Sequence, residues 1–237
     1  MPDKANNAII ISARMGSKRL PGKSMMKINN KFIIEHVASQ LEGVNWPFYF
    51  AIPDAEIDNS LNSFLSEKYG SEKVFRGNPV NVANRIWTVK NCLKLDNIMR
   101  ITGDDPCHSS NLVNASISEF HTKFKNAQYM SVIFNTLPDG LYHEIISSKK
   151  IDEINEWAKE DKLSAEHVTY RLKKTRKKDF SYDYNKILEK YEVSNLKLSL
   201  DTSEDFQFLK KLSRFTHDNK FDTEGIIDAF RKNQSFQ

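Results

Sequence analysis

The chain has 237 residues, of which 39% are hydrophobic and 28% charged, with a formal net charge of +4. This length suits one large or two small domains, and the composition is typical of a soluble globular protein. No apolar stretch approaches the roughly 20 residues of a membrane span, and the first residues show no secretory signal. Cys92 and Cys107 lie too far apart to suggest a zinc site or a disulfide framework. We therefore expect a cytoplasmic protein with no membrane partner.

The mildly basic charge is concentrated in one run, residues 173–178, which reads KKTRKK. No recognised nucleic-acid-binding motif accompanies this run. We interpret it as a solvated helix end or loop, with contact to a polyanion as the alternative. The sequence thus predicts no nucleic-acid partner.

Apolar runs alternate with helix-period segments through the first half of the chain. The expected strands are 8–13, 48–52, 73–75 and 97–102, and the expected helices are 33–41, 61–69 and 82–93. In the first helix, Ile34, Val37, Ala38 and Leu41 share one face. Such alternation is typical of an α/β protein with a mostly parallel sheet and helices on both faces.

The second half is less regular. We expect a strand at 129–134, a turn at 137–140, helices at 151–158 and 165–172, and a late strand at 197–200. Thr202 or Ser203 is expected to cap a helix that runs to Leu212, and a final helix covers 223–232. No repeat or linker is visible, so we predict a single domain over 1–237 with an inserted lobe at about 105–190.

The loop after the first strand carries four cations, Arg14, Lys18, Arg19 and Lys23, together with two glycines. In an open α/β sheet, ligands bind at the carboxyl ends of the strands. Glycines let backbone N–H groups approach a phosphate, and Arg and Lys neutralise its charge. The loop is therefore a candidate cradle for a triphosphate.

Two other interpretations of this loop remain open. Gly22-Lys23-Ser24 matches the tail of a Walker A loop, but the first position of that pattern would be Ser17 instead of glycine. Pro21 would also remove a backbone donor from a loop that works by donating N–H groups. The other interpretation is a solvated basic surface loop.

Two aspartates follow other expected strands, Asp104 after 97–102 and Asp201 after 197–200. Ends of parallel strands converge on one crevice even when they are distant in sequence. Magnesium is typically held by one or two carboxylates plus substrate phosphates. We predict a Mg²⁺ site at Asp104 and Asp201, although either residue alone is also a common turn or cap residue.

Several ordered motifs resemble one family. Residues 11–23 closely resemble the opening of the cytidylyltransferases that activate sugar acids, such as 3-deoxy-manno-octulosonate and acylneuraminate cytidylyltransferases. They look most like the spore-coat-polysaccharide branch. Further segments resemble the family motifs RG…DVLxRY (75–77 with 82–85), RITGDxP (100–106), PDGLDVE (138–141 with Glu144), REHVT (166–169) and VDTPEDL (201–205).

The resemblance implies a Rossmann-like three-layer nucleotidyltransferase fold and transfer of CMP from CTP to an acceptor, with Mg²⁺ as the cofactor. The implied nucleotide-binding residues are Ala13, Arg14, Gly16, Ser17, Arg19, Lys23, Arg76 and Asp104. The implied catalytic residues are Arg14, Lys23, Asp104 and Asp201, and the last two would hold the metal. Tyr142, Glu144 and His167 lie in segments expected to face the acceptor.

The resemblance also implies a homodimer built through the inserted lobe. Ile133, Phe134, Leu137 and Leu141 are candidates for such a patch, with core packing as the alternative.

The chain departs from the family mainly on the acceptor side, with Tyr142 in place of Asp and Ala165 in place of Arg. Asn81 and Ile86 replace an Asp and a Tyr in the helix on the phosphate side. We interpret these departures as a changed or less anionic acceptor. A catalytically silent nucleotide-binding partner protein and an enzyme that uses another nucleotide remain the alternatives.

Overall fold

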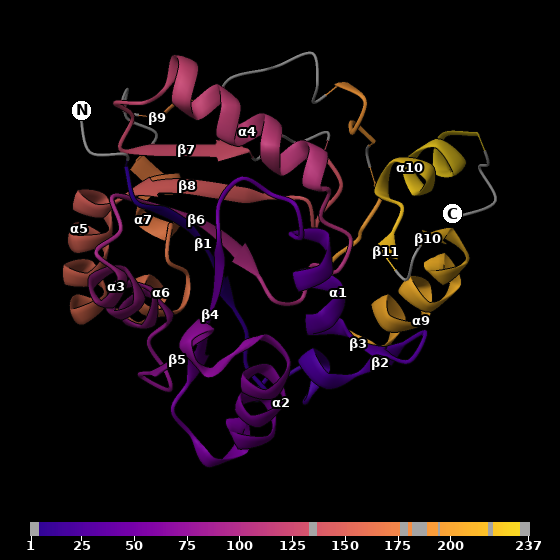
Figure 1. Cartoon of the computed structure of the whole chain (residues 1–237), viewed down its shortest axis with the longest axis horizontal. Helices are drawn as coiled ribbons and strands as arrows, with labels where there is room; N and C mark the ends of the chain where they lie inside the picture. Colours follow the sequence, from indigo (N-terminus) through magenta and orange to yellow (C-terminus); the bar gives the residue numbers. More distant parts are fainter. Residues whose placement is uncertain are drawn as a thin grey trace.

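The computed structural model of the chain describes residues 5–132, 137–175, 180–181, 189–193, 195–217 and 220–232. At its centre is a seven-stranded sheet with the strand order β5-β4-β1-β6-β8-β7-β9 (Figure 1). Its strands are β1 (Asn7–Ser12), β4 (Phe48–Pro53), β5 (Val74–Gly77), β6 (Asn97–Thr102), β7 (Tyr129–Val132), β8 (His143–Ser147) and β9 (Phe180–Ser181).

Four neighbouring strands, β5, β4, β1 and β6, are parallel. β8 pairs antiparallel with both β6 and β7, and β9 pairs parallel with β7. Parallel strands are covered on both faces, so they consist of continuous apolar runs. This is why the runs at 8–13, 48–52 and 97–102 predict strands correctly.

Successive side chains of each strand point to opposite faces of the sheet. Both faces carry apolar side chains, and helices cover both of them. Ile9 and Ile11 of β1 belong to one buried cluster, and Ala8 and Ile10 belong to the other. The first cluster also contains residues of α1 (Ile33–Gln40), α2 (Asn59–Tyr69), α4 (Ser110–Lys123), α9 (Ser203–Leu212) and α10 (Thr223–Lys232). The second contains residues of α3 (Val82–Leu93), α5 (Ser148–Glu160) and α7 (Tyr170–Thr175), with α6 (Lys162–Glu166) packed against it.

Figure 1 shows α3, α5 and α6 together at one side of the molecule and α1, α9 and α10 at the other. The predicted α/β fold with three layers and a mostly parallel sheet is therefore confirmed. Fully burying a Val, Leu, Ile, Phe or Met side chain contributes roughly 1.5–3 kcal/mol, so the two clusters are the main source of stability.

Short elements complete the chain. Two hairpins pair β2 (Lys27–Ile28) with β3 (Lys31–Phe32), and β10 (Thr216–His217) with β11 (Lys220–Phe221). Single 3₁₀ turns lie at η1 (Lys23–Met25), η2 (Glu56–Asp58), η3 (Ser71–Lys73) and η4 (Ser213–Phe215). Thr202 caps α9 as predicted, in a capping box with Asp205.

Two predicted elements are wrong. The expected helix 165–172 is interrupted between α6 and α7, where the hydroxyl of Thr169 donates to the Glu144 carboxylate 2.7 Å away. Residues 197–200 form no strand. Their backbone N–H groups donate hydrogen bonds to isolated residues outside the sheet instead of to a neighbouring strand. Leu198 N donates to Asp139 O at 2.6 Å, and Leu200 N donates to Asp104 O at 2.8 Å.

The segment 105–190 continues the main sheet through β8 and β7, and its role as an acceptor and dimerisation lobe stays a prediction. Of the four apolar residues considered for a dimer patch, Ile133 and Phe134 lie outside the described residues. Leu137 and Leu141 are buried in the larger core cluster, so core packing is the correct interpretation for these two. Within the described ranges, every helix is too short or too polar to cross a membrane.

Candidate functional site

A cavity of about 900 Å³ opens at the carboxyl ends of β1 and β6. One wall is the cationic loop that follows β1, and another is the end of β6 with Gly103 and Asp104. The segment around α6 and α7 also lines the cavity, and so does Asp201, from the loop before α9. The cavity thus lies where an open α/β sheet places its ligands.

The cationic loop is folded back on itself by backbone contacts. Met15 N donates to Asp58 Oδ1 at 2.7 Å, and Asp58 is 2% exposed. Gly22 N donates to Met15 O at 2.9 Å, and Ser24 Oγ donates to Arg14 O at 3.0 Å. These bonds fix the loop at the start of η1 and hold its cations along the cavity.

Lys23 joins the two predicted metal ligands. Its Nζ lies 2.5 Å from Asp104 Oδ2 and 3.1 Å from Asp201 Oδ1, and donates to Leu200 O at 2.6 Å. Lys23 is 8% exposed, so a buried ammonium holds the two carboxylates together. The bond from Leu200 N to Asp104 O brings Asp201 beside Asp104, although no strand precedes Asp201.

A second cation, Arg19, pairs with Asp201 at 2.8 Å between Nη2 and Oδ1. Partial burial raises the pKa of Asp201, but Lys23, Arg19 and Lys197 outweigh that effect and lower the pKa from its ordinary value. Asp201 is therefore an anion at neutral pH.

In the part of the lining that comes from α6, Glu166 accepts a hydrogen bond from Arg14 at 3.0 Å between Oε1 and Nη2. This ion pair spans the cavity from the loop after β1 to the end of α6. Both side chains remain partly exposed, 39% for Arg14 and 48% for Glu166.

Glu144 of β8 is buried next to the cavity. Arg100 Nε donates to its Oε2 at 2.8 Å, and the Tyr129 and Thr169 hydroxyls each donate to its Oε1 at 2.7 Å. Lys173 Nζ lies 3.3 Å from the same Oε1. Burial alone would raise the pKa of Glu144, but Arg100, Lys173 and the two hydroxyls lower it to about 2.

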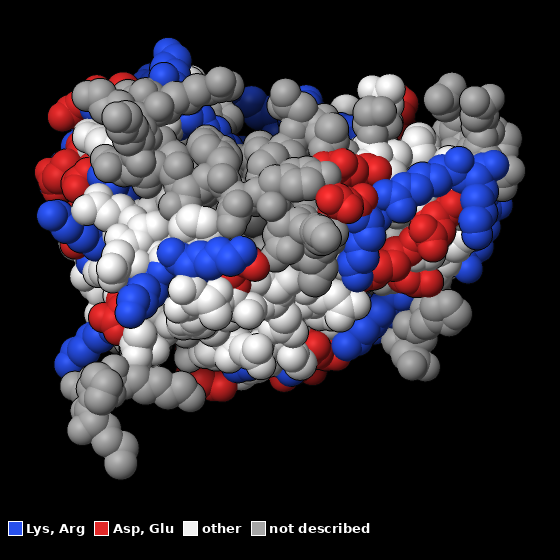
Figure 2. Space-filling model, turned by 90° about the horizontal axis from the view of Figure 1, so that it is seen from above, with Lys and Arg blue, Asp and Glu red and all other residues white. Residues whose placement is uncertain are grey.

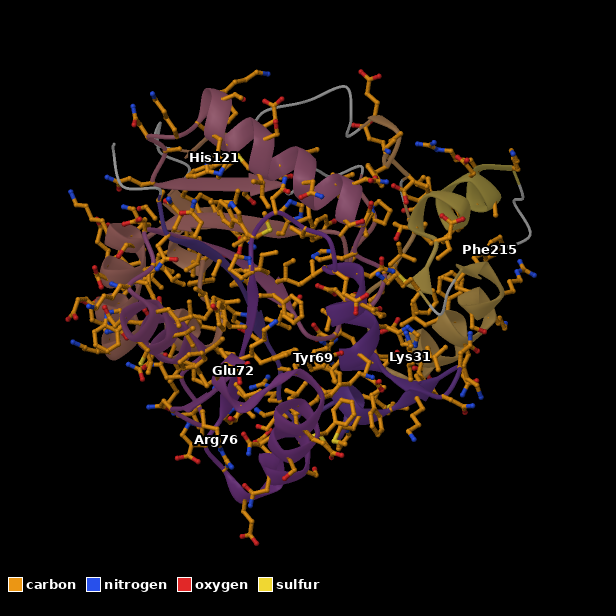
Figure 3. The ribbon with its side chains drawn as sticks, in the orientation of Figure 1. Lys31, Tyr69, Glu72, Arg76, His121 and Phe215 are labelled. Carbon is orange, nitrogen blue, oxygen red and sulfur yellow. The ribbon has the colours of Figure 1, made fainter. Side chains whose placement is uncertain are left out.

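Most of the predicted site residues line this cavity: Ala13, Arg14, Ser17, Arg19, Lys23, Asp104, His167 and Asp201. Gly16 is part of the loop but does not line the cavity, and Glu144 lies behind the wall. Arg76 points elsewhere and bonds with Ala55 O at 2.9 Å and Asn59 Oδ1 at 2.7 Å (Figure 3). The Tyr142 hydroxyl donates to Leu137 O at 3.1 Å, outside the cavity.

Sequence reasoning missed part of the lining. Arg85 and Arg100 line the cavity. So do Lys173 and Lys174 of the basic run, interpreted from its sequence as a solvated helix end or loop with contact to a polyanion as the alternative. Arg85 and Arg100 belong to the segments 82–85 and 100–106, which resemble family motifs, and this resemblance could have indicated them as site residues. Burial, and then the charge of Arg14, lower the pKa of Arg85 to about 10, and this group is still cationic at neutral pH. Other missed lining residues are Leu163 and Tyr170, whereas Lys18 belongs to the cationic loop predicted to face phosphates.

Cations dominate the lining. Eight Lys and Arg side chains face three carboxylates, those of Asp104, Glu166 and Asp201. On the face in Figure 2, by contrast, basic and acidic side chains of the described residues lie next to one another and do not gather by sign. The lining of the cavity therefore carries a net positive charge, which suits a polyanionic small molecule.

Comparisons with known proteins agree with this geometry. The sequence model of the cytidylyltransferase family matches residues 8–234. The spore coat polysaccharide biosynthesis protein SpsF of Bacillus subtilis is 26% identical over 211 residues, covering 86% of this chain and 84% of SpsF.

Solved structures share the fold. A cytidylyltransferase from Leptospira borgpetersenii has a TM-score of 0.87 at 23% identity, covering 98% of this chain and 97% of its own. A CMP:2-keto-3-deoxy-manno-octonic acid synthetase complexed with CTP has a TM-score of 0.61 at 16% identity, covering 88% and 98%. With almost its whole length matched, the chain belongs to the cytidylyltransferase family of nucleotidyltransferases.

Proposed function

We propose that the chain transfers CMP from CTP to a sugar acid or a related acceptor, with release of pyrophosphate, in a Mg²⁺-dependent reaction for surface polysaccharide or glycoconjugate synthesis. The observation that carries the proposal is the convergence of Lys23, Asp104 and Asp201 beside the cationic loop in one cavity. The similarity to SpsF supports the polysaccharide context.

In this proposal the triphosphate of CTP lies along the loop after β1. Arg14, Arg19 and Lys23 face the phosphates and neutralise their charge. Arg14 and Arg19 are held by carboxylates, Glu166 and Asp201, so binding requires an exchange of partners. The loop is held in shape by its bond to the buried Asp58, so its ordering adds little to the free-energy cost of binding.

The residues fit a magnesium ion. Asp104 and Asp201 both contact the Lys23 ammonium, so one cation is within reach of both carboxylates. Magnesium prefers oxygen ligands and usually takes one or two carboxylates plus substrate phosphates. When bound, it would supply charge stabilisation at the α-phosphate. Among the described residues no cluster of three or more His, Cys, Asp or Glu side chains forms a metal site, so the phosphates would complete the coordination.

The reaction is a displacement at phosphorus. A hydroxyl oxygen of the acceptor attacks the α-phosphorus and loses its proton to solvent. The bond from the α-phosphorus to the bridging oxygen breaks, so that pyrophosphate leaves with the electron pair. The protein contributes positioning and charge stabilisation more than covalent chemistry. Arg14, Arg19 and Lys23 are placed to stabilise the charge that develops on the leaving pyrophosphate.

Two further proposals accompany this one. Cys92 and Cys107 are free thiols, which is consistent with the reducing cytoplasm where we place the reaction. The family resemblance supports a homodimer. Analytical ultracentrifugation of the purified chain tests the second proposal, and a monomer at all concentrations would rule it out.

Thermal unfolding with CTP, UTP, ATP and GTP, each with and without Mg²⁺, tests the nucleotide. A ligand at about 100 times its Kd adds about 2.7 kcal/mol of stability, which raises the Tm of a chain of this size by roughly 5–10 °C. We expect a Mg²⁺-linked shift with CTP. A larger shift with another nucleotide would assign a different base, and no shift with any of them would contradict the proposal.

Pyrophosphate release tests catalysis. Asp104→Asn and Asp201→Asn are expected to lower the rate by at least about a hundredfold while the chain stays folded. The matched control is Asp152→Asn, at an exposed carboxylate of α5 outside the cavity. Nucleotide binding without turnover on any acceptor would indicate the silent partner protein instead.

A further inference from the structure

We propose that Arg100 and Lys173 form a second anion subsite in the cavity, which binds an acidic group of the acceptor. Glu144 is the residue that positions both cations. This inference rests on the proposed function, because it assigns the acceptor side of the same cavity.

Arg100 occupies an unusual place for a charged residue. It lies in the central strand β6, in register with Ile10 of β1 and with Glu144 of β8. Its neighbour two positions earlier, Ile98, belongs to the core cluster under α3 and α5. A buried ion pair stabilises a fold no better than apolar packing would, so stability alone does not account for Arg100.

Arg100 is oriented by one nitrogen and keeps others for a ligand. Its Nε donates to Glu144 at 2.8 Å, while the side chain lines the cavity and is 20% exposed. Among the described residues, Glu144 is the one hydrogen-bond partner of this guanidinium. A guanidinium held by Nε presents its two Nη groups as a fork, which matches a carboxylate or phosphate.

Lys173 supplies the second charge at the same point. It lies on α7 and lines the cavity, and its Nζ is 3.3 Å from Glu144 Oε1. One buried carboxylate thus faces two cations that both border the cavity. The subsite keeps a net positive charge, and Glu144 stays ionised at neutral pH because its pKa is about 2.

The subsite is separate from the cations that face the triphosphate. Arg14, Arg19 and Lys23 all come from the loop after β1 and pair with Glu166, Asp201 and Asp104. Arg100 and Lys173 come from β6 and α7, and both contact Glu144. Among the described side chains, none of the three loop cations contacts Glu144. A CTP molecule on the loop leaves these two cations for the other substrate.

The acceptor is therefore anionic, contrary to the less anionic acceptor suggested by Tyr142. That position lies outside the cavity, so its lost carboxylate changes no charge at the site. The acidic group is a carboxylate or a phosphate, since the fork of an arginine binds both.

The experiment uses inorganic phosphate and, separately, acetate as probes, at constant ionic strength, with CTP and Mg²⁺ saturating the loop. Anion affinity is obtained from the rise in Tm with probe concentration. Lys173→Gln and Arg100→Gln are expected to weaken probe binding by about tenfold, the factor for one charge-assisted hydrogen bond, with CTP affinity unchanged. Lys159→Gln, an exposed lysine of α5 paired with Glu156, is the control for lost charge.

The outcomes separate this inference from the proposed function. Tighter binding of phosphate indicates a phosphorylated acceptor, and tighter binding of acetate indicates a carboxylate. If CTP shifts the Tm but neither probe binds, or if both bind equally to wild type and to Lys173→Gln, the subsite is wrong while the nucleotide site stands. If CTP fails to bind, the proposed function is wrong, and probe binding sensitive to Lys173 still identifies the subsite.

The positioning role of Glu144 has its own readout. Glu144→Gln keeps an oxygen acceptor for Arg100, so we expect probe affinity within a few-fold of wild type. Glu144→Ala removes the acceptor, and we expect probe affinity to fall by about tenfold, the same loss that we expect for Lys173→Gln. Glu144 is only structural if one of the two variants has a lower Tm while both variants bind the probes and CTP as tightly as wild type does.

Discussion

Arg14 and Glu166 form an ion pair across the cavity, with 3.0 Å between Nη2 and Oε1, although they are 152 positions apart in the sequence. The pair joins a phosphate-loop cation to the wall that carries the acceptor side. In the proposed function Arg14 faces the triphosphate, so the ligand and Glu166 compete for one guanidinium.

Glu166→Gln is therefore expected to raise CTP affinity by about two- to fivefold, the range that corresponds to a partly exposed ion pair of about 0.4–1 kcal/mol. Titration of CTP followed by thermal unfolding measures the change. Glu156→Gln removes a carboxylate from an exposed ion pair on α5 and serves as the control. Unchanged or weaker CTP binding would show that Arg14 does not exchange partners.

Lys23→Met removes the ammonium between Asp104 and Asp201 and leaves two carboxylates facing each other. We expect the free energy of unfolding to fall by about 1–3 kcal/mol, the usual cost of an unsatisfied buried group. We also expect Mg²⁺ alone to raise the Tm of the variant more than that of wild type, because a cation then replaces the ammonium. Equal Mg²⁺ shifts for the two proteins would argue against a metal site at these aspartates.

The control for this change is Lys159→Met, which alters an exposed ion pair and is expected to change stability by about 0.5 kcal/mol or less. A similar Mg²⁺ response in the control would mean that the effect reflects net charge and not the site.

Stability is expected to fall in mild acid because two histidines are buried. His108 and His143 lie with ring centroids 5.7 Å apart, and burial lowers the pKa of His143 to about 4 and that of His108 to about 3. Below the ordinary value of 6.5 the unfolded chain binds more protons than the native one. Their contribution is therefore complete above about pH 6.5 and is lost as the pH falls toward 4 and 3.

The two shifts correspond to on the order of 3–5 kcal/mol each. Urea unfolding at several pH values from 8 to 4 measures the slope. His108→Gln is expected to lower the slope of unfolding free energy against pH by up to about 1.4 kcal/mol per pH unit. Comparing the variant with wild type at pH 8, where the histidine is neutral in both states, isolates the effect on packing. A slope identical to that of wild type would mean that His108 is protonated in the native state.

The main features of the fold could be predicted from sequence because the central strands are apolar on both faces. β1 and β4 are nearly continuous apolar runs, β6 is apolar apart from Asn97, Arg100 and Thr102, and α1, α3 and α5 show one apolar face each. β8 gave no such signal, because it begins with His143 and Glu144. Its buried carboxylate is satisfied by Arg100, which is close only in the folded chain.

The candidate site was predictable where strand ends carry charge and not where contacts are long-range. Lys23, Asp104 and the cationic loop follow strands that the pattern identifies. Asp201 lies beside Asp104 as predicted, but not because it follows a strand. The residues before it form no strand, and their backbone N–H groups donate to Asp104 O and Asp139 O. Lys173 and Lys174 resemble any solvated helix end until α7 is packed beside β8.

Gly103 follows β6 and lies against the end of β1, where its N–H donates to Ser12 O at 2.8 Å. A Cβ at this position would lie 2.7 Å from Ala13 Cβ, 3.0 Å from Ser12 O and 3.1 Å from Ile34 Cδ1, so the two strand ends must separate. Gly103→Ala is therefore expected to lower the free energy of unfolding by about 1–3 kcal/mol, as overpacking does in a close-packed core. Gly16→Ala is the stability control, because a Cβ there meets no atom within 4 Å.

The same substitution tests how tightly the site depends on the approach of these strands. β1 leads into the cationic loop and β6 leads into Asp104, so their separation moves the phosphate cations away from a proposed metal ligand. Misplacement of reacting groups by about 1 Å lowers a rate by roughly a hundredfold. We expect pyrophosphate release by folded Gly103→Ala to fall by that order, measured well below its Tm. If Gly103→Ala is destabilised but releases pyrophosphate at the wild-type rate, Gly103 contributes only to packing and Asp104 does not depend on it for its position.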